Sequence, residues 1–150
     1  MFKLVKILNG RINQPEPMAL PLTAGATPVT VKRGSLLTVK NGVLANCAAT
    51  DKPMYFCAHS TTLAAGETAE IPVFLLSPDM VFETTVAYSD TPKALALGGL
   101  YTLAQTTYDS ENGLSYASGM TDVSTGGVVR VFDLSRPDGD GKKIWVTIPQ

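Results

Sequence analysis

The chain has 150 residues, which is enough for one domain with a substantial core. Hydrophobic residues make up 45% and charged residues 17%, so the composition excludes a disordered chain. The net charge of −1 excludes a nucleic-acid binder driven by overall positive charge, and the single histidine excludes a His-rich metal centre. Thirteen glycines and ten prolines leave little room for helices and predict an all-β fold.

The N-terminal segment, residues 1–27, is predicted to be an extended arm and linker. Residues 2–8, FKLVKIL, have the composition of a strand that carries two lysines. Prolines at 15, 17, 21 and 28 exclude a helix in the segment that follows and favour an extended path. A lone strand needs a sheet to join, and the sequence leaves open whether that sheet is the chain's own or a neighbour's.

The body, residues 28–150, is predicted to consist of short strands separated by turns. Asn41-Gly42 is typical of a two-residue hairpin, and Pro72 suggests an edge or a bulge. One short helix is predicted, because Thr91 can cap it, Pro92 suits its first position and Gly98 can end it. The fold class is therefore all-β, a compact barrel or sandwich of short strands with one short helix. The expected strands cover 29–32, 35–40, 43–45, 53–60, 68–76, 80–86, 100–106, 127–135 and 143–148, with a loop or short hairpin over 108–119.

No stretch approaches the ~20 consecutive apolar residues of a membrane span. The N-terminus begins like a signal peptide, but Lys6 interrupts the apolar run and no small-residue cleavage site follows. We therefore expect a protein made in the cytoplasm, with neither a membrane nor a nucleic acid as partner. Two cysteines do not make a disulfide framework, and whether Cys47 and Cys57 pair stays open.

Candidate nucleophiles lack convincing partners. Ser115 lies in GLSYA, one residue away from the G-x-S-x-G motif, but no helix is predicted after it. Cys57 and His59 share a strand face about 6–7 Å apart, which is too far for a direct hydrogen bond. Adding Cys47 gives three metal ligands, where a structural zinc needs four.

The acidic residues also lack a catalytic or metal-binding pattern. An EF-hand loop starting at Asp138, in DGDG, would need glutamate at its twelfth place, which is Pro149. Asp109 and Glu111 are the closest functional-looking acidic pair, and both lie in a predicted loop. The sequence therefore predicts no catalytic residue, cofactor or metal site, and hence a protein that is not an enzyme.

Charge is distributed unevenly along the chain. Residues 1–40 contain six basic residues and one acidic residue, whereas residues 41–150 contain six basic and twelve acidic ones. A basic front on an acidic body can hold an acidic partner. The alternative is that this distribution has no function.

The order of these segments resembles that of the head decoration, or capsid cement, proteins of tailed bacteriophages. The resemblance lies in the run from VKRGSLLTVKNGVLANC to AGETAEIPVFLLSPDMVFET, in TPKALALGGLYTL, in GMTDVSTGGVVRVFDL and in the terminal KKIWVTI. Together these cover nearly all of residues 29–148. The pattern consists mostly of turns and apolar strands, and no single residue is diagnostic.

The resemblance implies a structural virion protein on the exterior of an expanded capsid, where it cements neighbouring major capsid subunits. It also implies a homotrimer. The candidate capsid-binding element is the N-terminal strand, since its alternation and lysines suit strand addition to an acidic edge. Its residues are Phe2, Lys3, Leu4, Val5, Lys6, Ile7 and Leu8.

Two other interpretations remain open. A different virion surface or tail component, or a carbohydrate-binding module, predicts exposed aromatic rings near Tyr101, Tyr108 and Tyr116. An enzyme predicts an activity that is lost on substitution of Ser115, Cys57 or His59.

Overall fold

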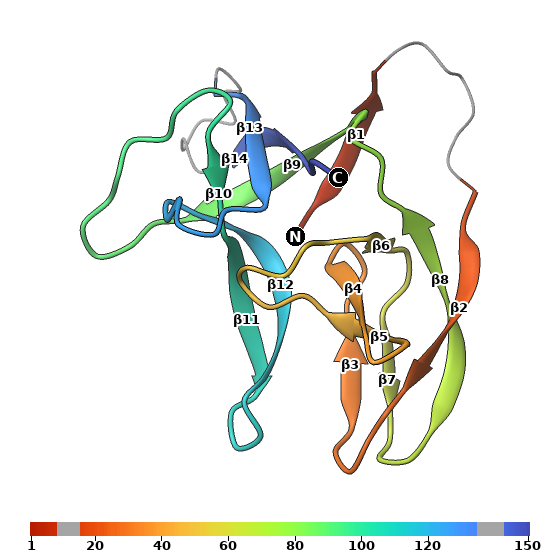
Figure 1. The fold of residues 1–150 in the computed structure, drawn as a ribbon. Helices are drawn as coiled ribbons and strands as arrows, with labels where there is room; N and C mark the ends of the chain where they lie inside the picture. The colour runs from red at the N-terminus through yellow and green to blue at the C-terminus, as the bar shows by residue number, and fades with distance from the viewer. Residues whose placement is uncertain (9–15, 135–142) are drawn as a thin grey trace.

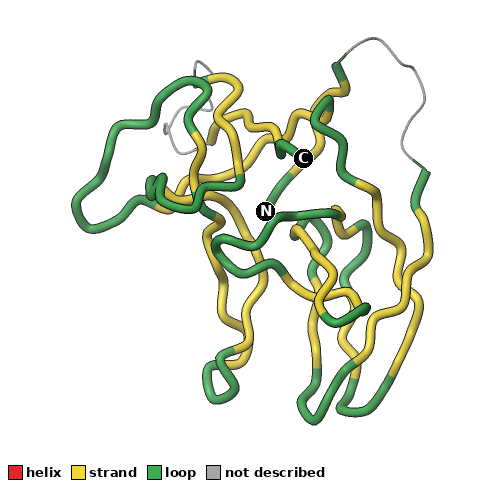
Figure 2. Tube along the Cα trace, in the orientation of Figure 1, coloured by secondary structure: helices red, strands yellow, loops and turns green. Residues whose placement is uncertain are grey.

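The computed structural model describes residues 1–8, 16–134 and 143–150, and it is built from strands and loops with no helix among these residues (Figure 2). The all-β class is confirmed. The strands are β1 Lys3–Ile7, β2 Met18–Thr23, β3 Val29–Val31, β4 Leu36–Lys40, β5 Val43–Asn46, β6 Tyr55–Cys57, β7 Thr61–Leu63, β8 Thr68–Leu75, β9 Met80–Ala87, β10 Leu100–Tyr101, β11 Leu103–Asp109, β12 Leu114–Thr121, β13 Val129–Asp133 and β14 Lys143–Thr147.

The larger sheet has seven strands in the order β10-β13-β14-β9-β12-β11, with β1 pairing with β9 beside this path (Figure 1). Alternation of apolar and polar residues determines which face is buried. Leu4, Phe82, Val146 and Val131 are register partners across four strands, and the last three are at most 1% exposed. This row forms the centre of the first hydrophobic core.

A second sheet has five strands in the order β2-β8-β6-β4-β5, and β3 and β7 form a separate ladder. One face of the second sheet lines the second core, around Leu37, Ile71 and Val73. The opposite face meets the first core, where the Phe56 ring lies 5.3 Å from the Phe82 ring, centroid to centroid. The second sheet therefore lies between two apolar clusters.

The Asn41-Gly42 hairpin is confirmed. Both residues have positive φ, 51° and 79°, which is the conformation of a type I′ turn, and β4 pairs with β5 directly on either side. The prediction for Pro72 was wrong, because β8 is an interior strand that pairs with β2 and β6. Pro72 is tolerated because the pairing of β6 with β8 ends at Cys57 and Val73. The N–H that Pro72 lacks would therefore lie beyond the last paired residues of β6.

The short helix predicted at 92–97 does not form, and residues 88–99 are an irregular loop. The few good helix formers here cannot offset the cost of nucleation, and side chains bind the backbone instead. The Asp122 carboxylate accepts hydrogen bonds from the backbone N–H of Ser89 and of Lys93. The Tyr101 hydroxyl accepts one from the N–H of Ala96 at 2.7 Å.

The extended N-terminal arm is likewise not confirmed. β1 pairs antiparallel with β9, and β2 pairs antiparallel with β8 over six register positions. Both segments are thus strands of the two sheets, and the boundary predicted near residue 28 does not separate an arm from a body. The reason is that each segment buries an apolar side chain: Phe2, directly before β1, lies in the first core, and Leu22 of β2 lies in the second.

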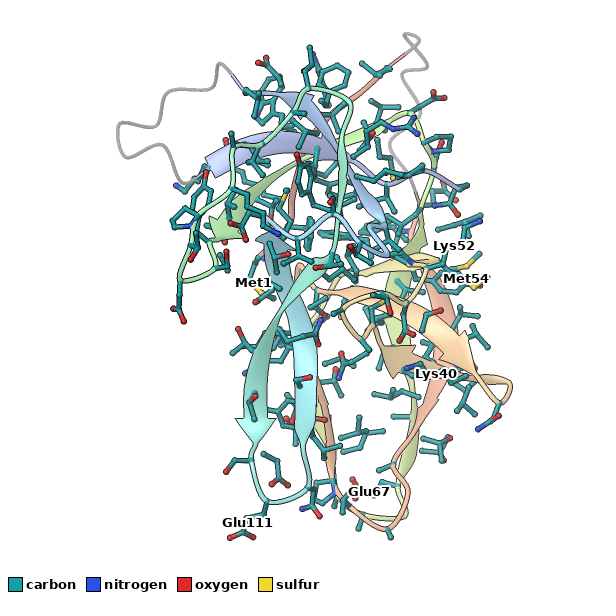
Figure 3. The ribbon with its side chains drawn as sticks, turned by 60° about the vertical axis from the view of Figure 1, so that its left-hand side comes forward. Met1, Lys40, Lys52, Met54, Glu67 and Glu111 are labelled. Atoms are coloured by element: carbon teal, nitrogen blue, oxygen red, sulfur yellow. The ribbon has the colours of Figure 1, made fainter. Side chains whose placement is uncertain are left out.

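The β11–β12 hairpin and the turn between β7 and β8 project from one end of the molecule, and each carries an acidic residue. Figure 3 shows Glu111 at the tip of the β11–β12 hairpin and Glu67 at the turn before β8. β13 and β14 lie at the opposite end (Figure 1). Glu67 and Glu111 therefore lie at the end of the molecule away from β13 and β14.

Candidate docking site

The serine candidate is not activated. Ser115 lies within β12, and its hydroxyl donates to the Gln105 side-chain oxygen at 3.0 Å across the β11–β12 hairpin. The contact is exposed, and no histidine takes part in it. The strand-to-helix turn that a nucleophile elbow requires is therefore not formed.

The two cysteines are free thiols that belong to different cores, Cys47 to the first and Cys57 to the second. Burial, followed by the nearby Asp51 carboxylate, raises the pKa of Cys47 to about 12. Burial also raises the pKa of Cys57, whose sulfur donates to the backbone carbonyl of His59. Both thiols are therefore protonated at neutral pH and poorly nucleophilic.

The acidic candidates have structural roles or lie outside the described residues. The Asp109 carboxylate accepts hydrogen bonds from the Asn112 side chain and from the backbone N–H of Glu111 and Asn112. These bonds, the Asn112 side chain first, lower the pKa of Asp109 and hold the hairpin turn. Asp138-Gly139-Asp140-Gly141 lies outside the described residues, and within those residues no group of three or more potential ligands could hold a metal ion.

The aromatic rings expected for glycan binding are only partly available. Tyr101, which a carbohydrate-binding module would need to expose, is only 5% exposed, and its hydroxyl accepts a hydrogen bond from the 88–99 loop. Tyr108 and Tyr116 are half-buried and stack on each other, with ring centroids 6.2 Å apart and planes 18° apart. Their mutual stacking leaves fewer ring faces for a sugar.

The N-terminal strand is firmly attached to its own chain. Phe2 is 2% exposed and meets Phe82 edge to face, with ring centroids 6.3 Å apart. Its backbone N–H donates to the carbonyl of Gly34 at 2.9 Å. Of the two arrangements that the sequence left open, the structure has β1 in the chain's own sheet.

The remaining residues of the predicted capsid-binding element divide between two faces of β1. Leu4, Val5, Ile7 and Leu8 are half-buried, whereas Lys3 and Lys6 are exposed. The Lys6 ammonium lies 4.9 Å from the centroid of the Trp145 ring and 5.2 Å from that of Phe132. Lys6 therefore covers aromatic rings of the outer face of the larger sheet and is less available to a partner than Lys3.

A groove of about 610 Å³ lies where β1 faces the second sheet. Lys3 and Leu4 of β1 line it together with Phe2, which precedes the strand, and Phe56 and Phe74 line it from β6 and β8. The lining is completed by Arg33, Gly34 and Ala58. Two cations and no carboxylate are among these residues.

Sequence reasoning missed the groove residues outside β1, because they come from three separate segments. The early excess of basic residues was the only signal that included Arg33. No family model, curated protein or solved structure matches this chain. Among the described residues no helix is long and apolar enough to cross a membrane.

Proposed function

We propose that this chain is a structural virion protein that binds the outer surface of an expanded phage capsid and cements neighbouring major capsid subunits. The observation that supports this best is a docking surface: the cation-bearing edge strand β1 lies beside an aromatic groove. The resemblance of the segment order to capsid cement proteins supplies the partner, the homotrimer and the location on the capsid exterior.

The mechanism is cohesive and needs no chemistry. A protein that binds only the expanded shell stabilises that shell in proportion to the logarithm of its concentration over its dissociation constant. Many copies on one lattice add avidity, because each bound copy restrains the subunits that its neighbours contact. To act as a rigid clamp, the chain must be stably folded, and its two hydrophobic cores provide that stability.

The burial of Phe2 decides how the docking element is tested. Deleting residues 1–14 would remove Phe2 and Leu4 from the first core as well as any partner contact. Loss of attachment would then be indistinguishable from unfolding. Charge reversal at Lys3, which is exposed, alters the same strand without opening the core.

The test begins with the number of copies of this chain in purified particles, measured by quantitative mass spectrometry after density-gradient sedimentation. A ratio near one to one with the major shell protein is the expected result. A few copies per particle would instead indicate a tail or vertex component, and absence from particles would refute the proposal. Lys3→Glu is expected to lower the ratio, whereas Lys52→Glu, at an exposed residue of the β5–β6 loop, serves as the matched control.

A further inference from the structure

One edge of β1 has no strand partner within the part of the chain that the structure describes. β9 pairs with β1 on one side, through Lys3↔Glu83, Leu4↔Phe82, Lys6↔Val81 and Ile7↔Met80. On the other side, the sheet order places no further strand next to β1. An edge strand of this kind presents backbone N–H and C=O groups that can pair with another extended chain.

The groove follows this unpaired edge. Lys3 and Leu4 are consecutive residues of β1 and Phe2 directly precedes them in extended backbone, so neighbouring side chains point to opposite faces. A groove lined by all three must therefore run along the edge of the strand. The hydrogen bond from Phe2 to Gly34 places the 33–34 turn, with Arg33, at the N-terminal end of this edge.

The wall opposite β1 is apolar. Phe56 and Phe74 lie 6.2 Å apart, centroid to centroid, and both are half-buried. The Phe56 ring packs against the ring of Phe82, which is fully buried. This wall is a preformed contact for a large apolar side chain, since its rings are already fixed by the core.

The positive charge of the groove determines the sign of the charge that a partner should carry. Arg33 is exposed, and its side chain has no ion pair within the described residues. Lys3 has Glu83 as its cross-strand neighbour on β9, which partly offsets its charge. Arg33 is therefore the cation that contributes most to recognition, and the partner it favours is acidic.

We propose that this groove binds an extended acidic segment of a partner protein, which adds a strand to the free edge of β1. Alternate side chains of that segment are large and apolar and contact Phe56 and Phe74. The intervening side chains point outward, and at least one carboxylate pairs with Arg33. With the function proposed above, on which this inference rests for the partner's identity, the segment belongs to a shell subunit.

The probe is a displayed library of random twelve-residue peptides, selected against the full chain. The expected enrichment is for peptides that alternate aromatic or aliphatic residues with aspartate or glutamate. Enriched peptides are then synthesised, and their dissociation constants are measured by fluorescence anisotropy. An absence of enrichment, or enrichment of peptides without carboxylates, would overturn the proposal.

Two variants locate the binding. Arg33→Glu is expected to weaken the selected peptides roughly tenfold or more, because one close charge pair becomes repulsive. Arg130→Glu, at an exposed arginine of β13, is the matched control and leaves the affinity unchanged. Phe74→Ser is expected to abolish binding, whereas Leu75→Ser, its neighbour on the other face of β8, is not. Equal binding by Arg33→Glu and wild type would overturn the proposal even if Phe74→Ser failed to fold.

The particle experiment separates this inference from the proposed function. If the wild-type chain is on particles and Arg33→Glu attaches equally, the groove is not the docking site and the cement function stands. If the peptides bind the groove but the chain is absent from particles, the groove stands and the cement function fails.

Discussion

β1 and the loop at 88–99 are attached to the rest of the molecule by different kinds of contact. β1 is held by a backbone ladder to β9 and by the buried Phe2 ring. The loop has mostly exposed side chains, and hydrogen bonds to the Asp122 carboxylate and the Tyr101 hydroxyl hold its first part. Leu95 packs against the first core, and Gly98 and Gly99 bond to the backbone of Val131. A segment held by a buried apolar side chain should loosen when that side chain is truncated. A segment held by a carboxylate should loosen when the carboxylate is protonated.

The largest effect is expected for Phe2→Ala, which removes the ring that attaches β1 to the first core. We expect a loss of about 3 kcal/mol in the free energy of unfolding, the low end for a buried phenylalanine because a chain terminus can relax. Urea denaturation followed by near-ultraviolet circular dichroism measures it. Amide exchange at Lys93 should stay slow in this variant, and equal loosening of both segments would contradict the comparison.

Gly34→Ala is expected to have the next largest effect. Gly34 has φ of +84°, and a Cβ there would lie 2.8 Å from the carbonyl oxygen of Phe2. Left-handed strain and this clash together should cost roughly 1–3 kcal/mol. Gly66→Ala is the control, since its φ is similar at +80° but no atom lies within 4 Å of the added Cβ. Chemical denaturation of the two variants gives the cost of the close approach as their difference, and equal costs would mean that the 33–34 turn is not fixed against β1.

Asp122→Ala should loosen the loop and leave β1 in place. Asp122 is 1% exposed, and its removal leaves the backbone N–H groups of Ser89 and Lys93 without their acceptor. Hydrogen exchange at these two amides should become faster, with exchange in β9 unchanged. Unchanged exchange at Lys93 would show that the Asp122 carboxylate does not hold this part of the loop.

Acid should reproduce the effect of Asp122→Ala. The hydrogen bond from the Lys93 backbone, followed by those from Ser89, lowers the pKa of Asp122 against an opposing effect of desolvation. A lowered pKa means that the stabilisation is fully present above the ordinary value of about 3.9 and is lost as pH falls through the folded-state pKa. The NMR chemical shift of the Lys93 amide, followed from pH 6 to pH 2, should therefore change over the same pH range in which hydrogen exchange at this amide becomes faster. In Asp122→Asn this transition should disappear, and its persistence would assign it to another group.

The smallest effect is expected for Leu97→Ser. Leu97 is 69% exposed on the loop, so its removal from the isolated chain should change the free energy of unfolding by less than about 0.5 kcal/mol. Thermal unfolding measures this, and a larger loss would mean that the loop packs on the body through its apolar side chains as β1 does.

The proposed docking site shows why only part of it could be predicted. The β1 residues are contiguous, and their strand character and charge are visible in the sequence. Phe56, Phe74 and Arg33 reach the same groove from β6, β8 and a turn, and nothing in their local sequence distinguishes them from ordinary residues of an interior strand or a turn. Convergence of separate segments is a property of strand order, which local patterns do not encode.

The sequence by itself determined what depends on neighbouring residues, namely the all-β class and the Asn41-Gly42 hairpin. These follow from backbone propensity and from the two-residue period of a strand. Only the tertiary structure decided that residues 92–97 are not helical, that Pro72 lies in an interior strand, and that β1 joins β9. In each case a partner distant in the sequence supplied the deciding contact: Asp122 for the loop, the end of β6 for Pro72, and Phe82 for β1.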